Sequence, residues 1–354
     1  MGGGGAQRVM VNLAGGFADR GYKVDLVVGS AEGHYLSQVS KDIRIVDLRV
    51  SRMVASTAPL IQYLRRERPA AMLSAMDYVN FVALWARRIA RVSTTLVISE
   101  HNTLSLAVRH ASRRRVRMRP WLMKRLYPWA DRMVAVSRGV ADDLAITTGL
   151  PRDRVDVIYN PVITPEIEAM AEAPLSHPWF EPRQPPVVLG AGRLTAQKDF
   201  GTLIRAFARV REHQPARLMI LGQGPDHSEL ESLINRLGLD QDVLLPGFVA
   251  NPYAYMARAS VFVLSSRWEG LPTVLIEALF CGAPVIATDC PSGPREVLDD
   301  GRHGRLVEVG DEQTLATEME RALAGNVGRP GRESWQPFDR EVVVNSYLKA
   351  LLGA

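Results

Sequence analysis

The stretch SSRWEGLPTVLIEALFCGAPVIATD, residues 265–289, contains two acidic residues, Glu269 and Glu277. Pro272 suits the first position of a helix because its φ is fixed, and Gly282 predicts the end of that helix. Nearly every residue between them is apolar, so the helix should be buried. An unpaired buried carboxylate is strongly unfavourable. We therefore expect Glu277 to be paired either with a protein donor or with a polyhydroxyl ligand.

An apolar run, residues 261–264, precedes this stretch and predicts a buried strand. The order strand, loop, helix is typical of anion-binding sites, because free backbone amides and the positive end of the helix dipole lie at the loop. The amides available to a phosphate are those of Gly270, Leu271 and Thr273, since Pro272 has no N–H.

A second pattern of this kind lies upstream in VVLGAGRLTAQKDF, residues 187–200. An apolar run predicts a strand, and Gly192, Arg193 and Lys198 follow it before a helical pattern begins. Two cations at a strand-to-helix turn can neutralise a pyrophosphate, the arginine as a planar fork and the lysine as a point charge. The alternative is ordinary surface charge, which the strand-turn-helix context disfavours.

These motifs resemble the retaining glycosyltransferases of family 4, which have the GT-B fold, and the resemblance covers most of the chain. GRLTAQKDF, LMILGQGP, SSRWEGLP and CPSGPREVLDDGRHGRLVEVGD occur in the same order as in that family. The resemblance implies an α/β protein of GT-B architecture, with two Rossmann-like domains facing across a cleft. It also implies transfer of a sugar, with retention, from a nucleotide diphosphate donor, expected to be a UDP-sugar, to a lipid-linked or cell-surface saccharide.

The resemblance also assigns roles to individual residues. Arg193 and Lys198 would neutralise the leaving diphosphate, Glu269 would hold sugar hydroxyls, and Glu277 would hold the ribose diol. His101, in the sequence SEHN after a predicted strand, would approach the donor sugar from the N-terminal domain, the alternative being a surface histidine. The further donor-binding candidates are Gly4, Gly5, Gly192, Gly270, Leu271 and Thr273. Glu296 is a looser assignment, for which a structural role in a turn is equally suitable.

The N-terminal half opens on glycines, residues 2–5, followed by a helical pattern and by strand candidates. The candidates are residues 23–28, 43–48, 71–74, 96–99 and 133–136, which together predict a Rossmann-like open sheet. In the family this glycine loop follows the first strand, whereas here Met1 precedes the glycines directly. Loss of that central strand would leave two rows of backbone groups unpaired. We therefore expect the native protein to continue upstream with a strand of about six residues.

Three segments follow from these motifs. Residues 1–163 are predicted to form an acceptor-binding domain, because the family's approach to the interdomain linker is matched by residues 157–161. Residues 164–334 would form the nucleotide-sugar donor-binding domain. Residues 335–354 resemble the helix that crosses back to the first domain in GT-B enzymes.

No metal or cofactor is expected. The one Asp-x-Asp sequence, residues 240–242, lies in a predicted helix-to-strand loop, at the sheet edge opposite the ligand edge, and is interpreted as surface charge. The two cysteines, Cys281 and Cys290, give neither a disulfide framework nor a metal cluster, which fits a reducing cytoplasm.

Charge is uneven along the 354 residues. Residues 1–163 contain 25 Lys and Arg against 13 Asp and Glu, and the excess is densest in residues 109–129, where aromatic and aliphatic residues interleave with the basic ones. Such a segment suits an anionic membrane surface, the alternative being a solvated helix face. No nucleic-acid-binding signature accompanies it. With no apolar stretch of about 18 residues, the sequence predicts a cytoplasmic protein, peripheral at the inner face of the cell membrane.

Two other functions fit part of the pattern. An NAD-dependent dehydrogenase also uses a glycine loop, but residues 2–5 lack the preceding strand and the G-x-G-x-x-G spacing. A noncatalytic nucleotide-sugar-binding protein on a decayed GT-B scaffold is the other, and the presence of Arg193, Lys198, Glu269 and Glu277 argues against it.

Overall fold

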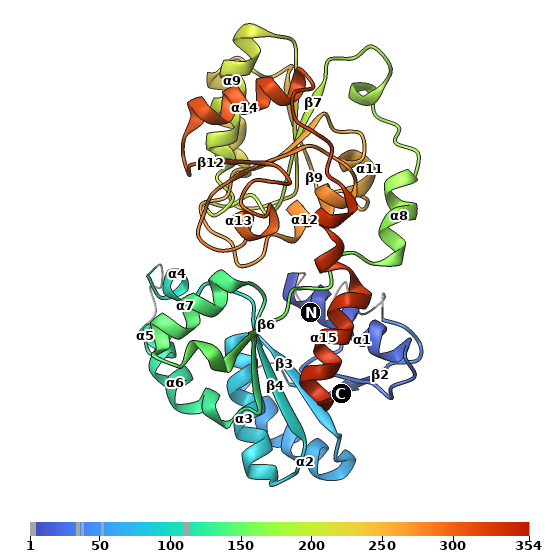
Figure 1. The fold of residues 1–354 in the computed structure, drawn as a ribbon, viewed down its shortest axis with the longest axis vertical. Coiled ribbons are helices and arrows are strands. Elements are labelled where there is room, and N and C mark those ends of the chain that lie inside the picture. Colours follow the sequence, from blue (N-terminus) through green and yellow to red (C-terminus); the bar gives the residue numbers. More distant parts are fainter. Residues whose placement is uncertain (1–4, 33–35, 37–38, 51–52, 110–113, 354) are drawn as a thin grey trace. The chain divides into compact units, whose positions relative to one another are not determined.

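A computed structural model describes residues 5–32, 36, 39–50, 53–109 and 114–353. The chain divides into two compact units. Unit 1 comprises Met1–Val162 and Phe338–Ala354, and unit 2 comprises Ile163–Pro337. In both units parallel strands alternate with helices, so the predicted α/β class is confirmed (Figure 1).

Unit 2 is built on a six-stranded parallel sheet of order β12-β11-β10-β7-β8-β9. The strands are β7 (Val187–Ala191), β8 (Arg217–Leu221), β9 (Val243–Gly247), β10 (Val261–Leu264), β11 (Val285–Thr288) and β12 (Arg305–Val307). Chain order runs one way from β7 to β9 and the other way from β10 to β12, so it reverses between the paired strands β7 and β10. Ligands of open α/β sheets bind beyond the carboxyl ends of the strands at such a switch point.

Helices cover this sheet because its central strands are apolar at nearly every position. All residues of β7, β10 and β11 are buried, as expected for strands covered on both faces. On one face α9 and α14 pack against each other (Figure 1). The helices are α8 (Pro165–Glu172), α9 (Phe200–His213), α10 (His227–Arg236), α11 (Tyr253–Met256), α12 (Thr273–Phe280), α13 (Pro294–Val297) and α14 (Glu312–Leu323), with 3-10 turns at Pro178–Phe180, Arg332–Ser334 and Gln336–Phe338.

The strands of unit 1 form two parallel sheets within the described residues, of order β1-β2 and β3-β4-β5-β6. They are β1 (Asp25–Val28), β2 (Arg44–Asp47), β3 (Ala71–Ala75), β4 (Thr95–Glu100), β5 (Arg132–Ala135) and β6 (Val155–Val157). The predicted strands are therefore present, and within the described residues they divide into two sheets, as expected where the central first strand of a Rossmann-like sheet is lacking. In the usual strand order, the strand before the first helix lies between those equivalent to β1 and β3. The two sheets of unit 1 are separated at that position, between β1 and β3.

The helices of unit 1 pack on these sheets and on one another, with α2 beside α3 and α1 beside α15 (Figure 1). They are α1 (Gly5–Ala18), α2 (Thr57–Glu67), α3 (Asp77–Ala90), α4 (Leu104–Arg109), α5 (Arg114–Arg117), α6 (Arg119–Leu126), α7 (Arg138–Thr148) and α15 (Arg340–Leu352), with 3-10 turns at Met53–Ser56, Tyr127–Trp129 and Arg152–Arg154.

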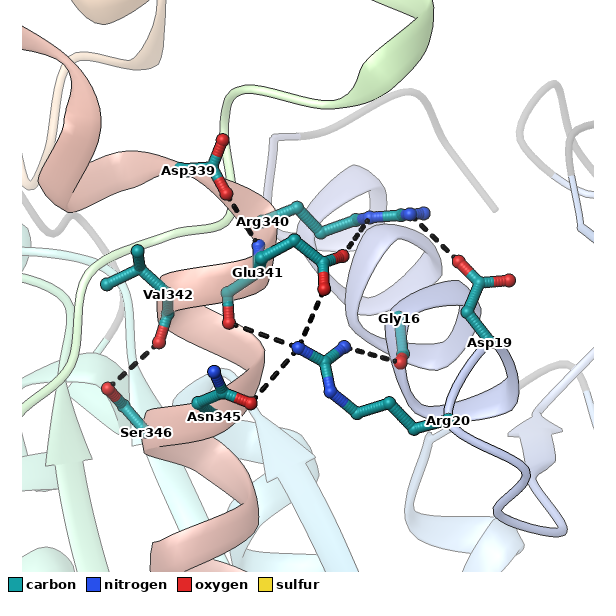
Figure 2. A network of polar contacts seen from close by, with 9 residues as sticks. All are labelled: Gly16, Asp19, Arg20, Asp339, Arg340, Glu341, Val342, Asn345 and Ser346. Carbon is teal, nitrogen blue, oxygen red and sulfur yellow. Dashed lines mark hydrogen bonds and ion pairs between the residues drawn. The ribbon is translucent and has the colours of Figure 1, made fainter. Parts of the chain in front are cut away.

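Helix α15 is fastened to the end of α1 by a polar network (Figure 2). The Arg20 guanidinium donates to a carboxylate oxygen of Glu341 at 2.8 Å, to Asn345 Oδ1 at 3.0 Å and to the carbonyl of Gly16 at 3.0 Å. Arg340 forms an ion pair with Asp19 at 2.8 Å. Arg20, just after α1, reaches acceptors on α15, and Arg340, the first residue of α15, reaches Asp19, so these bonds fix the end of α1 against the start of α15.

Beneath this network the two helices approach closely at Gly16. A Cβ added to Gly16 would lie 2.4 Å from Cγ2 of Val344, whose side chain is fully buried. The neighbouring Gly15 differs, because a Cβ there would meet only Arg340 Nη1, at 3.7 Å. Gly16 is therefore required by packing, whereas Gly15 is not.

We expect Gly16→Ala to lower the free energy of unfolding by about 1–3 kcal/mol, the usual effect of forcing extra volume into a packed core. The matched control, Gly15→Ala, should raise it by up to about 1 kcal/mol, because alanine has the higher helix propensity. Urea denaturation measures both. Changes of the same sign and size would contradict the packing argument.

Candidate active site

Two loops follow the central strands of unit 2 at the switch point. Residues 192–199 follow β7 and lead into α9, and residues 265–272 follow β10 and lead into α12. Because β7 and β10 are hydrogen-bonded neighbours, the two loops leave the same edge of the sheet together. Two sequence motifs that lie far apart in the chain are thus brought to one place.

The two loops are joined by an ion pair. Lys198 Nζ donates to Oε1 of Glu269 at 2.6 Å, and Ser266 Oγ donates to the same oxygen at 2.6 Å. The Lys198 and Glu269 side chains are only 16% and 8% exposed, so water screens the pair less than it would at the surface. An ammonium group has three N–H donors, so Lys198 can hold Glu269 and an anion at once.

Further bonds fix the loops to each other. The Gln197 amide donates to the carbonyl of Trp268 at 2.9 Å, and the backbone N–H of Arg267 donates to the carbonyl of Gln197 at 2.8 Å. The Arg267 side chain also pairs with Asp199 at 2.9 Å. Asp199 is buried and adopts a φ of +46°, a region that Asp tolerates better than most residues. The position of Lys198 is thus set by its neighbours on both sides.

The glycines of LGQGP explain why a third loop lies against these two. A Cβ on Gly222 would lie 1.9 Å from the carbonyl oxygen of Gly192, and one on Gly224 would lie 2.1 Å from that of Leu194. Backbone bonds hold the same contact, with Leu194 N–H donating to the carbonyl of Gln223 at 3.0 Å. The role of these glycines, which is to let one backbone approach another, could not be predicted from the motif.

Gly293 has the same function in a fourth loop. Its φ is +94°, and an added Cβ would lie 2.4 Å from Cδ of Pro272 and 3.2 Å from the carbonyl oxygen of Gly270. The same Cβ would lie 3.3 Å from Cα of Leu271. This packing restrains the turn that carries the predicted donor-binding amides. Glu296 lies nearby in sequence, within α13.

Helix α12 begins at Thr273, so the prediction that Pro272 occupies its first position is wrong by one residue. Pro272 has a ψ of 88° and acts as the N-cap, with its carbonyl accepting from Leu275 N–H at 3.0 Å.

Arg193, in the loop after β7, is exposed, and within the described residues its guanidinium forms no ion pair. It is therefore available to an anion at this edge of the sheet.

Glu277 is buried on α12, and Tyr253 OH lies within hydrogen-bonding distance of its Oε1, at 3.4 Å. Tyr253 is thus a protein donor, one of the two kinds of partner expected for Glu277.

Burial raises the pKa of the Cys281 thiol to about 12, with the charge of Glu277 adding to the effect. Burial likewise raises the pKa of Cys290 to about 12, with a contribution from Glu269. Both thiols are protonated at neutral pH, which excludes them as thiolate nucleophiles.

The Asp-x-Asp sequence lies between α10 and β9. Asp242 forms ion pairs with Arg211 at 2.9 Å and with Arg217 at 3.8 Å. Throughout the described part of the chain, no group of three or more His, Cys, Asp and Glu side chains is placed to hold a metal ion.

His101 follows β4 in unit 1. Its Nε2 lies 3.2 Å from Ser99 Oγ, which in turn lies 3.3 Å from the hydroxyl of Tyr347 on α15. Ser99 and Tyr347 are both fully buried. Burial lowers the pKa of His101 to about 4, so the ring is neutral at pH 7 and can donate one hydrogen bond and accept another. No sequence pattern pointed to Tyr347, which lies 248 residues from Ser99.

A buried polar network lies beside His101. Glu100 accepts hydrogen bonds from Tyr127 OH and, at 2.8 Å, from the Asn80 amide, whose oxygen accepts from Ser74 Oγ at 2.8 Å. Burial raises the pKa of Glu100 to about 8, against the opposing effect of its two donors. Sequence reasoning missed this residue. An acid at the end of an apolar strand is a related signal, since Glu277 was singled out as an acid within an apolar helix.

The glycine loop is only partly described. Gly4 lies outside the described residues, and Gly5 is the first residue of α1, where an added Cβ would meet nothing within 4 Å. The predicted positions therefore fall into three groups. Arg193, Lys198, Glu269, Glu277, Gly192, Gly270, Leu271 and Thr273 belong to unit 2, His101 and Gly5 belong to unit 1, and Gly4 is not described.

Comparison with known proteins identifies relatives of the whole chain. A family described as "Glycosyltransferase Family 4" matches residues 3–165, and one described as "Glycosyl transferases group 1" matches residues 185–325. The N-acetylgalactosamine-N,N'-diacetylbacillosaminyl-diphospho-undecaprenol 4-alpha-N-acetylgalactosaminyltransferase of Campylobacter jejuni is 33% identical over 279 residues, which cover 77% of this chain and 74% of the relative. The lipopolysaccharide core biosynthesis glycosyltransferase LpsE of Rhizobium meliloti is 26% identical, covering 98% and 96%.

A solved structure supports the fold of both units. HepE of Anabaena, in complex with UDP, has a TM-score of 0.76 and 23% identity, covering 99% of this chain and 97% of HepE. The predicted GT-B architecture is thereby confirmed. The relatives named above are transferases, so the dehydrogenase alternative is not supported.

Glu100 should make stability depend on pH. In the folded protein its pKa is about 8, whereas the ordinary value is 4.5, so the folded state keeps a proton that the unfolded state has lost. The stability from this proton is fully present below the unfolded pKa and is lost as pH rises through about 8. His101, with its folded pKa lowered to about 4, has its effect at lower pH, where stability falls as pH drops below about 6.5.

We therefore expect the free energy of unfolding to decrease from about pH 6.5 to pH 8, by roughly 1 kcal/mol per pH unit. Glu100→Gln should remove most of this slope, because the amide does not titrate. His101→Gln, as control, should keep the slope. Urea denaturation across this pH range measures all three proteins, and an unchanged slope in Glu100→Gln would disprove the titration of Glu100.

Proposed function

Because the chain belongs to the group 1, or family 4, glycosyltransferases, we propose that it transfers a sugar from a UDP-sugar to a lipid-linked or cell-surface saccharide, with retention and without a metal ion. The observation that carries this proposal is the Lys198–Glu269 pair beside the exposed Arg193, at the switch point of unit 2. The UDP complex of HepE supports the choice of nucleotide. The diphospho-undecaprenol named in the Campylobacter relative supports a lipid-linked acceptor.

The proposed mechanism centres on the leaving group. When the bond between the sugar's anomeric carbon and the diphosphate oxygen breaks, negative charge grows on the β-phosphate. Arg193 and Lys198 supply positive charge at this edge of the sheet, and fixed donors stabilise a developing charge better than mobile water does. The amides of Gly270, Leu271 and Thr273, at the start of α12, add donors for the phosphates. This set neutralises the leaving group without a metal.

The two acids have separate roles in the proposal. Glu269 Oε1 is fixed by Lys198 and Ser266, so the carboxylate is oriented before the sugar arrives and can accept from its hydroxyls. Glu277 is fixed on α12 beside Tyr253 and would accept from the ribose diol. Both acids are buried, which favours hydrogen bonding to a ligand over hydrogen bonding to water.

Unit 1 would contribute to the sugar and acceptor. A neutral His101 imidazole can exchange hydrogen bonds with a sugar hydroxyl without adding a charge, and Ser99, itself in contact with Tyr347, holds the ring. Gly4 and Gly5 are proposed to approach the donor phosphates, by family resemblance.

The basic segment, residues 109–129, is proposed to meet an anionic membrane at the cytoplasmic face. Trp121 and Met118 are 57% and 56% exposed, and the Arg125 guanidinium lies 5.8 Å from the centre of the Trp121 ring. Exposed aromatic and aliphatic groups beside cations suit a lipid interface. None of the helices in the described residues is both long enough and apolar enough to span a membrane.

The clamp is tested by substitution. Arg193→Ala or Lys198→Ala should each lower kcat by about 10²-fold or more, because a donor to the developing charge is lost. Glu269→Gln should lower transfer while leaving affinity for free UDP nearly unchanged, whereas Glu277→Gln should chiefly weaken UDP binding. Steady-state transfer assays and calorimetric titration with UDP measure these effects.

Arg236→Ala, an exposed arginine on α10, is the control and should transfer sugar at the wild-type rate. The assays are run with and without EDTA, and transfer should persist in the chelator. Wild-type turnover in both clamp variants would refute the assignment, and loss of transfer in EDTA would refute metal independence.

Membrane binding is tested with vesicles. The protein should bind vesicles containing phosphatidylglycerol at low salt and release them as ionic strength rises, because screening shortens the reach of each charge to about 8 Å at physiological salt. Changing Arg113, Arg114, Arg115 and Arg117 to Gln should abolish this binding and leave donor hydrolysis unchanged. Equal binding to neutral and anionic vesicles, or to neither, would favour a soluble acceptor.

A further inference from the structure

A basic cavity lies in unit 1 between the ends of α2 and α3. It is wide open to solvent, with a volume of about 710 Å³, and its lining residues are all exposed: Arg65 on α2, Arg88 and Ile89 on α3, and Arg91, which caps α3. The two helices pack against each other (Figure 1). Three arginines from different turns therefore line the same space.

Two of these arginines are held in place around the cavity. Arg65 Nη2 donates to the carbonyl of Ile89 at 3.1 Å, and the Arg88 guanidinium lies 4.4 Å from the centre of the Trp129 ring. Trp129 is fixed in turn by an edge-on contact with Trp85, with 5.1 Å between ring centres. A guanidinium has five N–H donors, so Arg65 keeps most of its donors for a ligand.

The lining arginines differ from Arg66 and Arg87, which are adjacent to Arg65 and Arg88 in sequence. Arg66 pairs with Glu67 at 2.8 Å, and Arg87 pairs with Asp131 at 2.9 Å. In contrast, within the described residues Arg65, Arg88 and Arg91 form no ion pair with a carboxylate. Arginines at a helix C-terminus also stabilise the helix dipole. Within the described residues Arg68, the C-cap of α2, also forms no ion pair, so what sets the cavity apart is that each arginine in its lining lacks a carboxylate partner.

We propose that this cavity is a binding site for the phosphate group of an anionic ligand, separate from the donor site. Guanidinium forks match the spacing of phosphate oxygens, and an anion relieves the repulsion among the three cations. Trp85 and Ile89, 45% and 46% exposed, place apolar surface beside the cations. A phospholipid headgroup and a free diphosphate share the required chemistry.

The site is also distant from His101. The cavity lies at the amino end of β4, since Arg91 precedes the strand, and His101 follows its carboxyl end. The six residues of β4 span about 20 Å. A ligand in the cavity would therefore occupy the edge of the unit 1 sheet opposite to the edge that carries His101.

Two probes test the site in the full chain. Calorimetric titration with inorganic pyrophosphate uses a parent carrying Arg193→Ala and Lys198→Ala, so that the proposed donor site does not contribute. Vesicle sedimentation uses the otherwise native protein with phosphatidylglycerol or pure phosphatidylcholine vesicles. The pocket variant changes Arg65, Arg88 and Arg91 to Gln. Its control changes three exposed arginines of unit 2, Arg183, Arg236 and Arg329, to Gln, with the same loss of charge.

The pocket variant should bind at least one probe about tenfold or more weakly than the control variant, as expected for the loss of several charge-assisted hydrogen bonds. Loss of pyrophosphate binding would identify a soluble phosphate ligand, and loss confined to anionic vesicles would identify a lipid headgroup. The single variant Arg91→Gln, which removes no described contact of its side chain, should show the same direction if the triple variant folds poorly. Equal binding by pocket and control variants, or no binding of either probe by their parents, would overturn the proposal.

Discussion

The candidate site of unit 2 depends on the reversal of strand order between β7 and β10. Because these strands pair, the loops that follow them emerge side by side, and Lys198 meets Glu269 across 71 residues of sequence. Each loop then ends at a helix N-terminus, which adds backbone donors to the same edge. In a sheet without this reversal, the same two motifs would be separated by other strands and would be ordinary surface charge.

Unit 2 was the part most open to prediction, because its signals are local. Its central strands are apolar throughout, and its cations and acids stand directly after them in sequence. A parallel sheet must then bring such residues to one edge. The error of one residue at the start of α12 has a local cause as well, since the ψ of 88° at Pro272 cannot be read from the residue type.

The features that escaped prediction depend on contacts between distant segments. The hydroxyl of Tyr347 reaches Ser99 only because α15 packs on the sheet of unit 1, and no local pattern marks that tyrosine. The role of Gly222 depends on a backbone that arrives from another loop. The arginine cavity combines two helices whose basic residues look like ordinary surface charge in the sequence. The most basic segment of the sequence is residues 109–129, which does not include the arginines of the cavity.

The position of α15 in unit 1 has a consequence for folding during synthesis on the ribosome. Val343, Val344 and Tyr347 belong to the same apolar cluster as Val9 and Val97, yet they are translated after the whole of unit 2. Domains generally fold as units during synthesis. Unit 2 can therefore complete its core while unit 1, although synthesised first, still lacks the apolar side chains of α15. We therefore expect unit 1 to complete its core after unit 2, and the Tyr347 hydroxyl reaches Ser99, the partner of His101, only when the last helix docks.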